Sequence, residues 1–410
     1  MQLRKNRGIS LNQLRHGRHS FRKLAFYGHI GNEFITDGIY SAITATGHRT
    51  ATALDTWKQR RNMALLKTEF PNNILIINKI NCKIKTNPSF TLFRRISFSL
   101  RKKAMKESYS LCFTSHDEVM FRDEEDHGMF INVMAIEGYR TESEILSDSE
   151  MSTHVHINAF TRCPTVFSGR TRMSYTCYFN RKYGRSGRFG QKGTYCLKVD
   201  GFYHQLILSN YILRNGLHHC AAASAFGYPY CSIQEMFAKD MGNNLEPAVF
   251  TRREEIAGFL PRYADFPDSY VMNKNGIFLR SSFMEIRRVE QYYASPRNFL
   301  YQMNRLTDDT WLEEQRQDNT GKPITLVDIE PGYNEKNIAE LLNNEYGRNF
   351  SRSRMQDLDV CRLIDKEILP GLGCNSVYGM TDSQKRKVYQ VLLNEFGLSE
   401  KQIRRCLVYR

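Results

Sequence analysis

The sequence predicts an α+β fold, in which an antiparallel sheet carries packed helices and is followed by a mainly helical C-terminal region. Two observations lead to this prediction. Between residues 107 and 215, segments with the period-two alternation of strands alternate with segments of helical spacing, in the order β-α-β-α-β-α. After an irregular stretch that begins near residue 235, the long periodic segments are all helical.

The elements of the first region are predicted in chain order. Asp123-Glu124-Glu125-Asp126 places negative charge where a helix N-terminus favours it, and Gly138 lies near the end of that helix. The other expected elements are a strand or hairpin at 109–121, a β segment at 144–160, a basic helix at 171–183, a strand at 195–199 and a helix at 202–215. We expect residues 105–237 to form one domain.

The rest of the chain divides into two regions. We expect residues 238–330 to be an irregular linker or accessory region, in which Asn273-Lys274-Asn275-Gly276 forms a hairpin turn. Residues 331–410 are expected to be helical. The helices predicted after the turn lie at 296–306, 337–346 and 355–369.

Residues 381–410 are a helix-turn-helix candidate. Thr381 and Gln384 have the spacing of a capping box, Gly397 can end the first helix, and Ser399 can cap the second. The second helix is expected to expose three basic residues, Lys401, Arg404 and Arg405. Such a pair of helices binds duplex or hairpin DNA in some proteins and is only a packing element in others.

Charge is distributed unevenly along the chain. The 410 residues are 41% hydrophobic and carry a formal net charge of +15, a basic balance that favours a nucleic-acid partner. Residues 1–104, however, hold 20 Lys/Arg and only 4 Asp/Glu, whereas the remaining 306 residues hold 38 and 39. DNA affinity of the remaining chain must therefore come from local patches.

Residues 1–104 are expected to be a basic N-terminal extension that is disordered or non-essential. Three interpretations stay open: an arm that holds DNA by charge, an extension from a misassigned start with Met105 as the functional start, or an organelle transit peptide, for which 104 residues is long. No apolar run approaches the roughly 20 residues that span a bilayer, so no membrane partner is expected. The ten scattered cysteines form no C-x-x-C pair and indicate a reducing compartment.

His154-Val155-His156 is the first candidate for chemistry. In a strand, His154 and His156 project from one face while Val155 turns to the core. Two imidazoles on one face can bind one divalent ion. An isolated pair of this kind is also common on the surface of an amphipathic strand, so the pair alone does not distinguish a metal site from two surface histidines.

Tyr211 and Asn215 are the second candidate pair. They lie four residues apart on a predicted helix and therefore share a face. A phenol can act as a covalent nucleophile beside a metal, and an amide oxygen can be a third ligand. The alternative is a core tyrosine followed by an asparagine C-cap. Nearby His204, His218 and His219 are either proton-transfer groups or structural histidines.

Five ordered motifs give these residues a context. Residues 108–237 resemble the REP-associated tyrosine transposases, which belong to the single-tyrosine HUH (histidine-hydrophobic-histidine) endonucleases. The matching segments are VMFRDEED at 119–126, MSTHVH at 151–156, YFNRKYGRSG at 178–187, QKGTY at 191–195 and YILRNGL at 211–217. Thr153, Lys192-Gly193 and Gly216 depart from the family pattern, as does Ile157-Asn158-Ala159, which is more polar than the apolar run that usually follows the histidine pair.

The resemblance implies a ferredoxin-like HUH fold and a role for each matched residue. His154 and His156 would be metal ligands, Asn215 the third ligand and Tyr211 the nucleophile, with Mg²⁺ or Mn²⁺ as the cofactor. The expected substrate is single-stranded, hairpin-associated DNA. The expected protein is a monomer or homodimer of the bacterial cytoplasm and nucleoid.

The hypothesis for function is therefore a transposase-type endonuclease and strand transferase. Tyr211 would attack the scissile phosphate to form a 5′-phosphotyrosine and release a 3′-hydroxyl. One alternative is a domesticated, non-catalytic DNA-binding regulator that keeps the fold. Another is a replication initiator or relaxase of the wider HUH group, against which the YFNRKYGRSG stretch and the single-tyrosine helix argue.

Residues 170–192 are predicted to contact DNA. Basic side chains can bind phosphates while aromatic rings stack on unpaired bases; an amphipathic helix with a solvated loop is the alternative. The basic residues are Arg172, Arg181, Lys182, Arg185, Arg188 and Lys192, and the aromatic residues are Tyr175, Tyr178, Phe179, Tyr183 and Phe189.

Overall fold

A computed structural model describes residues 105–115, 117–190, 194–318, 322–346 and 349–409. The expectations for residues 1–104 and for Lys192 lie outside these residues. Within them, a four-stranded antiparallel sheet with packed helices and a helical C-terminal region confirms the predicted α+β class.

The sheet has the strand order β2-β3-β1-β4. Its strands are β1 (Glu107–Thr114), β2 (Glu144–Met151), β3 (His154–Thr161) and β4 (Tyr195–Val199). Each neighbouring pair is antiparallel, and β1 pairs Cys112 with His156 and Thr114 with His154. The β segment predicted at 144–160 is thus a hairpin whose turn contains Ser152 and Thr153.

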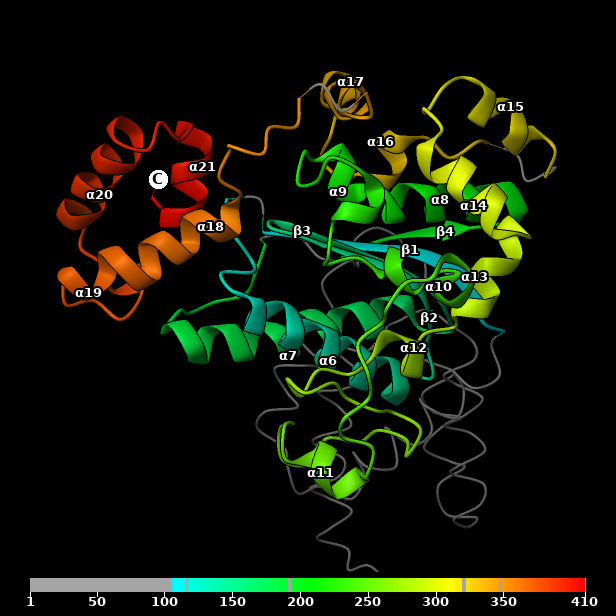
Figure 1. Cartoon of the computed structure of the whole chain (residues 1–410), viewed down its shortest axis with the longest axis horizontal. Helices are drawn as coiled ribbons and strands as arrows, with labels where there is room; N and C mark the ends of the chain where they lie inside the picture. The colour runs from blue at the N-terminus through cyan, green and yellow to red at the C-terminus, as the bar shows by residue number, and fades with distance from the viewer. Residues whose placement is uncertain (1–104, 116, 191–193, 319–321, 347–348, 410) are drawn as a thin grey trace, which may run out of the picture. The chain divides into compact units, whose positions relative to one another are not determined.

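Two helices connect the strands on one face of the sheet. Helix α6 (Glu124–Arg140) follows β1, and α7 (Pro164–Tyr183) follows β3. The Asp123 side chain accepts a hydrogen bond from the Asp126 backbone N–H, so the predicted acidic helix start is correct. Figure 1 shows both helices covering one face of the sheet, with α8 (Phe202–Leu213) on the other.

The alternation of side chains along β1 and β3 creates one apolar and one polar face. Leu111, Val155 and Ile157 are fully buried against α6 and α7, which confirms that Val155 turns to the core. Cys112, His154 and His156 therefore point to the face that α8 covers. Both histidines are buried there, His154 at 6% exposure and His156 at 0%, so the alternative of a surface pair is wrong.

The segment after β1 differs from the prediction. The strand expected at 109–121 ends at Thr114, because Val119 packs into the core of the C-terminal helices rather than continuing the sheet. The backbone N–H of Val119 donates to the carbonyl of Arg405. This contact between distant parts of the chain overrides the local alternation of the sequence.

Short helices fill the region between α8 and residue 345. They are α9 (Asn215–His218), η1 (Ala225–Gly227), η2 (Ser232–Glu235), α10 (Ala238–Met241), α11 (Arg253–Ala257), α12 (Arg280–Phe283), α13 (Ile286–Tyr293), α14 (Pro296–Asn304), α15 (Thr310–Arg316), α16 (Leu326–Ile329) and α17 (Glu335–Asn344). The predicted turn at 273–276 is present, with Gly276 at a φ of 71° and its N–H donating to the Asn273 carbonyl. Only single bridges flank it among the described residues.

The C-terminal helices share one core. They are α18 (Asp357–Arg362), a π-helical turn η3 (Leu363–Ile368), α19 (Leu369–Gly371), η4 (Val377–Gly379), α20 (Asp382–Asn394) and α21 (Glu400–Leu407). The predicted capping box at Thr381 and the cap at Ser399 are both formed. Buried Arg122 joins this region to the sheet domain through Asp365 and the carbonyl of Cys406.

Gly216 has a packing role that the sequence did not reveal. A Cβ atom at this position would lie 2.4 Å from the Cβ of Tyr228, well inside van der Waals contact. The Tyr228 hydroxyl in turn donates to the carbonyl of Glu150 at 2.7 Å. The glycine lets this tyrosine pack directly on the segment that follows Tyr211.

A buried carboxylate anchors α17 to the segment after α8. Glu345 accepts hydrogen bonds from His218 Nε2 at 2.7 Å and from the Thr307 backbone and hydroxyl, both at 2.6 Å, and lies 3.2 Å from Arg214. Burial raises the pKa of Glu345, but these hydrogen bonds and the Arg214 charge outweigh it and lower the pKa to about 2.

Replacing Glu345 with glutamine is expected to lower the free energy of unfolding by about 3 kcal/mol at pH 7, because folding lowers the pKa of this carboxyl from its ordinary value of 4.5 to about 2. Because the folded pKa is depressed, this contribution is present above the unfolded pKa and is lost as the pH falls towards 2. Denaturant unfolding at pH 7, 5 and 3.5 measures it, with exposed Glu340→Gln in α17 as the control. A difference that grows towards low pH would contradict the assignment.

Candidate functional site

Four side chains from distant parts of the chain meet at the carboxylate of Glu330, the residue that follows α16. His156 Nε2 lies 2.9 Å from Glu330 Oε1, and the Nε2 atoms of His154 and His219 each lie 3.7 Å from the same oxygen. The Tyr211 hydroxyl donates a hydrogen bond to it as well. The structure thus joins the predicted pair on β3 to the predicted tyrosine on α8.

His156 and Glu330 are a strongly coupled buried pair. Burial alone would lower the pKa of His156, but Cys112 and Glu330 raise it to about 10. Burial also raises the pKa of the Cys112 thiol, whereas the nearby His156 lowers it. Burial raises the pKa of the Glu330 carboxyl, but the imidazoles of His156 and His154 outweigh it and hold this pKa well below the usual range.

Tyr211 is held rigidly at the site. It is fully buried, its ring packs edge-on against His156 with a centroid distance of 5.7 Å, and it stacks on His218 at 4.9 Å. Burial, followed by the negative charge of Glu330, raises the pKa of the phenol well above its usual value. Deprotonation of Tyr211 therefore requires positive charge near its oxygen.

Three of these side chains, His154, His219 and Glu330, have the spacing of a metal coordination shell. Ligand bonds of about 2.1 Å place neighbouring donor atoms roughly 3.0 to 3.4 Å apart, and the three imidazole nitrogens lie 2.9 to 3.7 Å from Glu330 Oε1. The ligand atoms of His154, His219 and Glu330 all lie within 4.8 Å of one another. His156 contacts Glu330 but is not part of this group of three. Two imidazoles with one carboxylate suit a divalent transition ion.

The orientation of His154 and His219 also fits an ion. The Thr153 hydroxyl lies 3.4 Å from Nδ1 of His154, which leaves Nε2 directed to Glu330. The Nε2 atom of His219 is buried and has no hydrogen-bond partner among the described residues. A buried imidazole nitrogen without a partner is costly unless something binds it.

No hydrogen bond among the described residues joins Asn215 to this group. Its side chain is fully buried, and neither amide atom has a hydrogen-bond partner among the described residues. Glu330 is the oxygen donor that the structure places beside the histidines. The sequence carried no signal for Glu330, which lies 119 residues after Tyr211 in a region expected to be a linker. His219 was considered only for proton transfer or structure.

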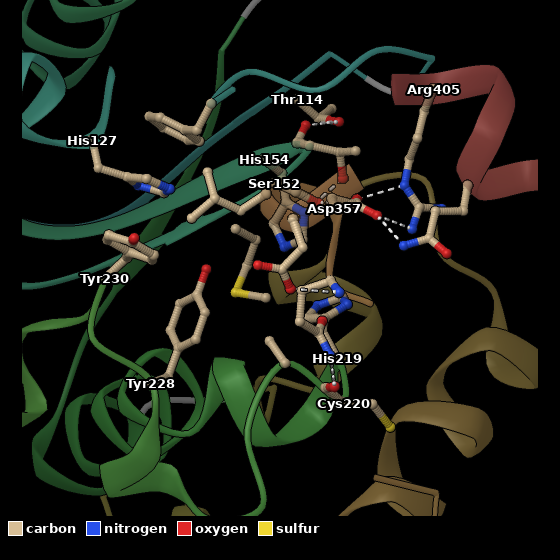
Figure 2. A pocket seen from close by; sticks show the side chains of 18 of the residues that line it. Thr114, His127, Ser152, His154, His219, Cys220, Tyr228, Tyr230, Asp357 and Arg405 are labelled. Atoms are coloured by element: carbon tan, nitrogen blue, oxygen red, sulfur yellow. Dashed lines mark hydrogen bonds and ion pairs between the residues drawn. The ribbon is translucent and has the colours of Figure 1, made fainter. Parts of the chain in front are cut away.

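A pocket of about 560 Å³ opens onto the site. Figure 2 looks into it, with His154 and His219 near the centre, His127 and Tyr230 on one side, and Asp357 and Arg405 on the other. Glu330 lines the pocket, whereas Tyr211 does not.

The aromatic residues predicted to stack on bases lie mostly in the core. Tyr175, Phe179 and Phe189 are fully buried and pack together beneath the sheet, so the stacking prediction is wrong for them. Half-buried Tyr178 packs against the same core and donates to Asp126. Tyr183 also donates to Asp126, at 2.8 Å. The helical spacing of these rings reflects packing between α6 and α7.

Two of the predicted DNA-binding cations are held by acids of the chain. Lys182 contacts Asp123, Glu125 and Asp126 at 2.8 to 3.0 Å. Arg185 pairs with Glu118. Their charges are thereby compensated within the fold.

The other predicted cations lie nearer to solvent. Arg172 is half-buried, and burial followed by the charge of Arg188 lowers its pKa. Arg181 and Arg188 are exposed. For Arg172, Arg181 and Arg188, contact with DNA remains a proposal.

The three cations of the last helix have different environments. Lys401 and Arg404 are exposed as predicted, and Arg404 lies 3.9 Å from Glu400. The expectation that Arg405 is exposed is wrong, because it pairs with Asp357 at 2.6 Å. Lys401 and Arg405 line the pocket, whereas Arg404 does not.

No protein-family model matches the chain, and searches of the curated proteins and of the solved structures give no significant match. The resemblance carried by the five motifs therefore stays a prediction from the sequence. Among the described helices, none has the length and apolar character needed to cross a bilayer.

Proposed function

We propose that this chain is a metal-dependent, single-tyrosine DNA endonuclease and strand transferase of the transposase type. One observation carries the proposal: the Tyr211 hydroxyl and the imidazoles of His154 and His156 meet at one buried carboxylate, Glu330. The β-α-β-β-α-β order with strand order β2-β3-β1-β4 is that of a ferredoxin-like sheet and supports the HUH version of that fold.

The proposed ion ligands are His154, His219 and Glu330, with His156, which contacts Glu330, as a further donor. Glu330 thus takes the role that the sequence assigned to Asn215. His156 must lose the proton that it shares with Glu330 before Nε2 can bind an ion. The donor set is compatible with Mn²⁺ or Mg²⁺, and the imidazoles favour Mn²⁺. The bound ion would polarise the scissile phosphate and favour the phenolate form of Tyr211.

The proposed reaction conserves the energy of the phosphodiester. The Tyr211 oxygen forms a bond to phosphorus while the bond from phosphorus to the 3′ oxygen breaks. The departing oxygen keeps the electron pair and takes up a proton, so a 3′-hydroxyl and a 5′-phosphotyrosine result. Another 3′-hydroxyl can reverse the step and join strands without a nucleotide cofactor.

The side chain of Glu330 must move for this reaction. Glu330 lines the pocket and accepts a hydrogen bond from the Tyr211 hydroxyl, while Tyr211 itself has no exposed surface. A phosphate in the pocket reaches the phenol only when this carboxylate turns away from the hydroxyl. The complete burial of Tyr211 is also the observation that favours the second candidate function, a non-catalytic DNA-binding regulator.

Incubation of the protein with a labelled single-stranded hairpin oligonucleotide separates the two functions. With Mn²⁺, we expect a shortened product and a denaturation-resistant protein–DNA adduct. Removal of the ion with a chelator should reduce both by at least about 100-fold, because the phenol stays protonated, and added Mn²⁺ should restore them. Binding without cleavage would favour the regulator, and cleavage that persists in chelator would contradict the metal-dependent mechanism.

A further inference from the structure

The pocket above the site is bordered by four Lys/Arg residues of the C-terminal region. They are Arg354, Arg362, Lys401 and Arg405. Arg354 precedes α18, and Lys401 lies in α21. This part of the wall therefore comes from outside the domain to which the sequence assigned the chemistry. Figure 1 shows α18 and α21 at the end of the sheet where β3 begins.

Two of these cations are neutralised by neighbouring acids. Arg405 forms a two-point ion pair with Asp357, with distances of 2.6 and 2.7 Å. Asp357 also accepts hydrogen bonds from Gln402 at 3.0 Å and Ser152 at 2.7 Å, so it is fully engaged. Arg362 pairs with Glu124 and lies 3.6 Å from Asp359.

Arg354 and Lys401 are not compensated in this way. Both are exposed, and neither has an acidic partner within 4.0 Å among the described residues. In the pocket itself, the carboxylate of Glu330 is engaged by the imidazoles of His154, His156 and His219. The rim therefore carries positive charge that a bound anion can neutralise.

The pocket has the volume and the polar lining to hold a small part of an extended anion. Its volume of about 560 Å³ is in the range that accepts a drug-sized ligand. Ser152, Thr153 and Gln356 add polar groups to the lining between the cations and the ion site. A flexible strand can enter such a space one nucleotide at a time, with its other phosphates outside.

We propose that Arg354 and Lys401 bind backbone phosphates of the single strand that lie beside the scissile phosphate. This inference rests on the proposed function, and it assigns part of the substrate site to the C-terminal helical region. The helix-turn-helix candidate then acts as a wall of the active site through Lys401, rather than only as a separate duplex-binding unit. Arg405 holds that wall against the β2–β3 turn through Asp357 and Ser152.

The test measures binding in a chain that cannot form the covalent link. In a full-length Tyr211→Phe background, the double variant Arg354→Gln, Lys401→Gln is titrated with a labelled single-stranded oligonucleotide by fluorescence anisotropy. Each phosphate contact to single-stranded DNA contributes a salt slope of about 0.7. We therefore expect the slope to fall by about 1.4 and the affinity at 0.1 M salt to fall roughly 25-fold.

The matched control removes one arginine charge and one lysine charge at positions outside the pocket. Arg352 and Lys387 are exposed and belong to the same region, but they do not line the pocket. Arg352→Gln, Lys387→Gln should lower the affinity several times less than the pocket pair. Equal losses in both double variants, or an unchanged slope in the pocket variant, would overturn the assignment.

The parallel adduct assay, with Tyr211 restored, distinguishes the two proposals. One outcome is that the pocket variant binds DNA weakly and that the chain with Tyr211 binds DNA but never forms an adduct. This outcome supports the phosphate site and rules out the catalytic function. An adduct that forms normally, with no binding difference between the variants, keeps the function and removes the phosphate site.

Discussion

Replacement of Tyr211 by phenylalanine is expected to abolish the covalent protein–DNA adduct and to reduce strand cleavage at least about 1,000-fold. The phenol oxygen is the proposed attacking atom, and phenylalanine keeps the ring that packs against His156 and His218. Single-turnover cleavage of a hairpin oligonucleotide in Mn²⁺ measures the loss.

Tyr293→Phe is the matched control for this substitution. Tyr293 is also fully buried, and its hydroxyl donates to Asn210 of α8 at 2.9 Å. Each variant loses one buried hydrogen bond and should be destabilised by about 1 kcal/mol. Only Tyr211→Phe should lose the adduct. Comparable adduct formation in wild type and Tyr211→Phe would exclude Tyr211 as the nucleophile.

Replacement of Glu330 by glutamine is expected to weaken Mn²⁺ binding by at least about 100-fold. Loss of groups that merely orient ligands typically costs 10- to 100-fold, and Glu330 is proposed as a direct ligand. Glutamine keeps the shape of the side chain but removes the charge that faces three imidazoles. Titration calorimetry with Mn²⁺ measures the change without dependence on cleavage.

Glu340→Gln removes the same charge from an exposed position nearby and should leave Mn²⁺ affinity unchanged. His154→Ala should reproduce the loss seen in Glu330→Gln, because both groups belong to the proposed ligand set. Asn215→Ala, by contrast, should retain Mn²⁺ binding. Loss of the ion in Asn215→Ala but not in Glu330→Gln would restore the ligand set that the sequence alone predicted.

The sequence predicted the parts of the site that local patterns define. Alternation around Val155 correctly placed His154 and His156 on one face of a strand, and helical spacing correctly placed Tyr211 on a helix. These patterns depend only on the geometry of one strand or one helix. They do not reveal which distant residue completes the site.

Glu330 could not be predicted because its role arises from tertiary packing. The residue follows the four-residue helix α16, whose Leu326 and Ile329 pack against the buried face of α8. This packing brings the carboxylate to Tyr211, and no spacing rule connects residues 119 positions apart. Glutamate at the end of a short apolar segment is an unremarkable pattern in the sequence.

Residues 170–192 illustrate an ambiguity of composition. Basic and aromatic residues at helical spacing are compatible with a DNA-binding surface. They are equally compatible with a helix that packs its rings in the core and pairs its cations with acidic residues of a neighbouring helix. In the structure, α6 supplies Asp126 and Glu125 to Lys182, and the rings of Tyr175 and Phe179 join the core. The sequence could not show that α6 lies alongside α7.

The most direct test of the central claim is to locate the covalent bond. The adduct formed in Mn²⁺ is digested with protease and nuclease, and the peptides are sequenced by mass spectrometry. We expect a nucleotide residue attached to the Tyr211 side chain through a phosphodiester bond. A nucleotide attached to any other residue, or no modified peptide although the strand is cut, would contradict a single site built from Tyr211, the β3 histidines and Glu330.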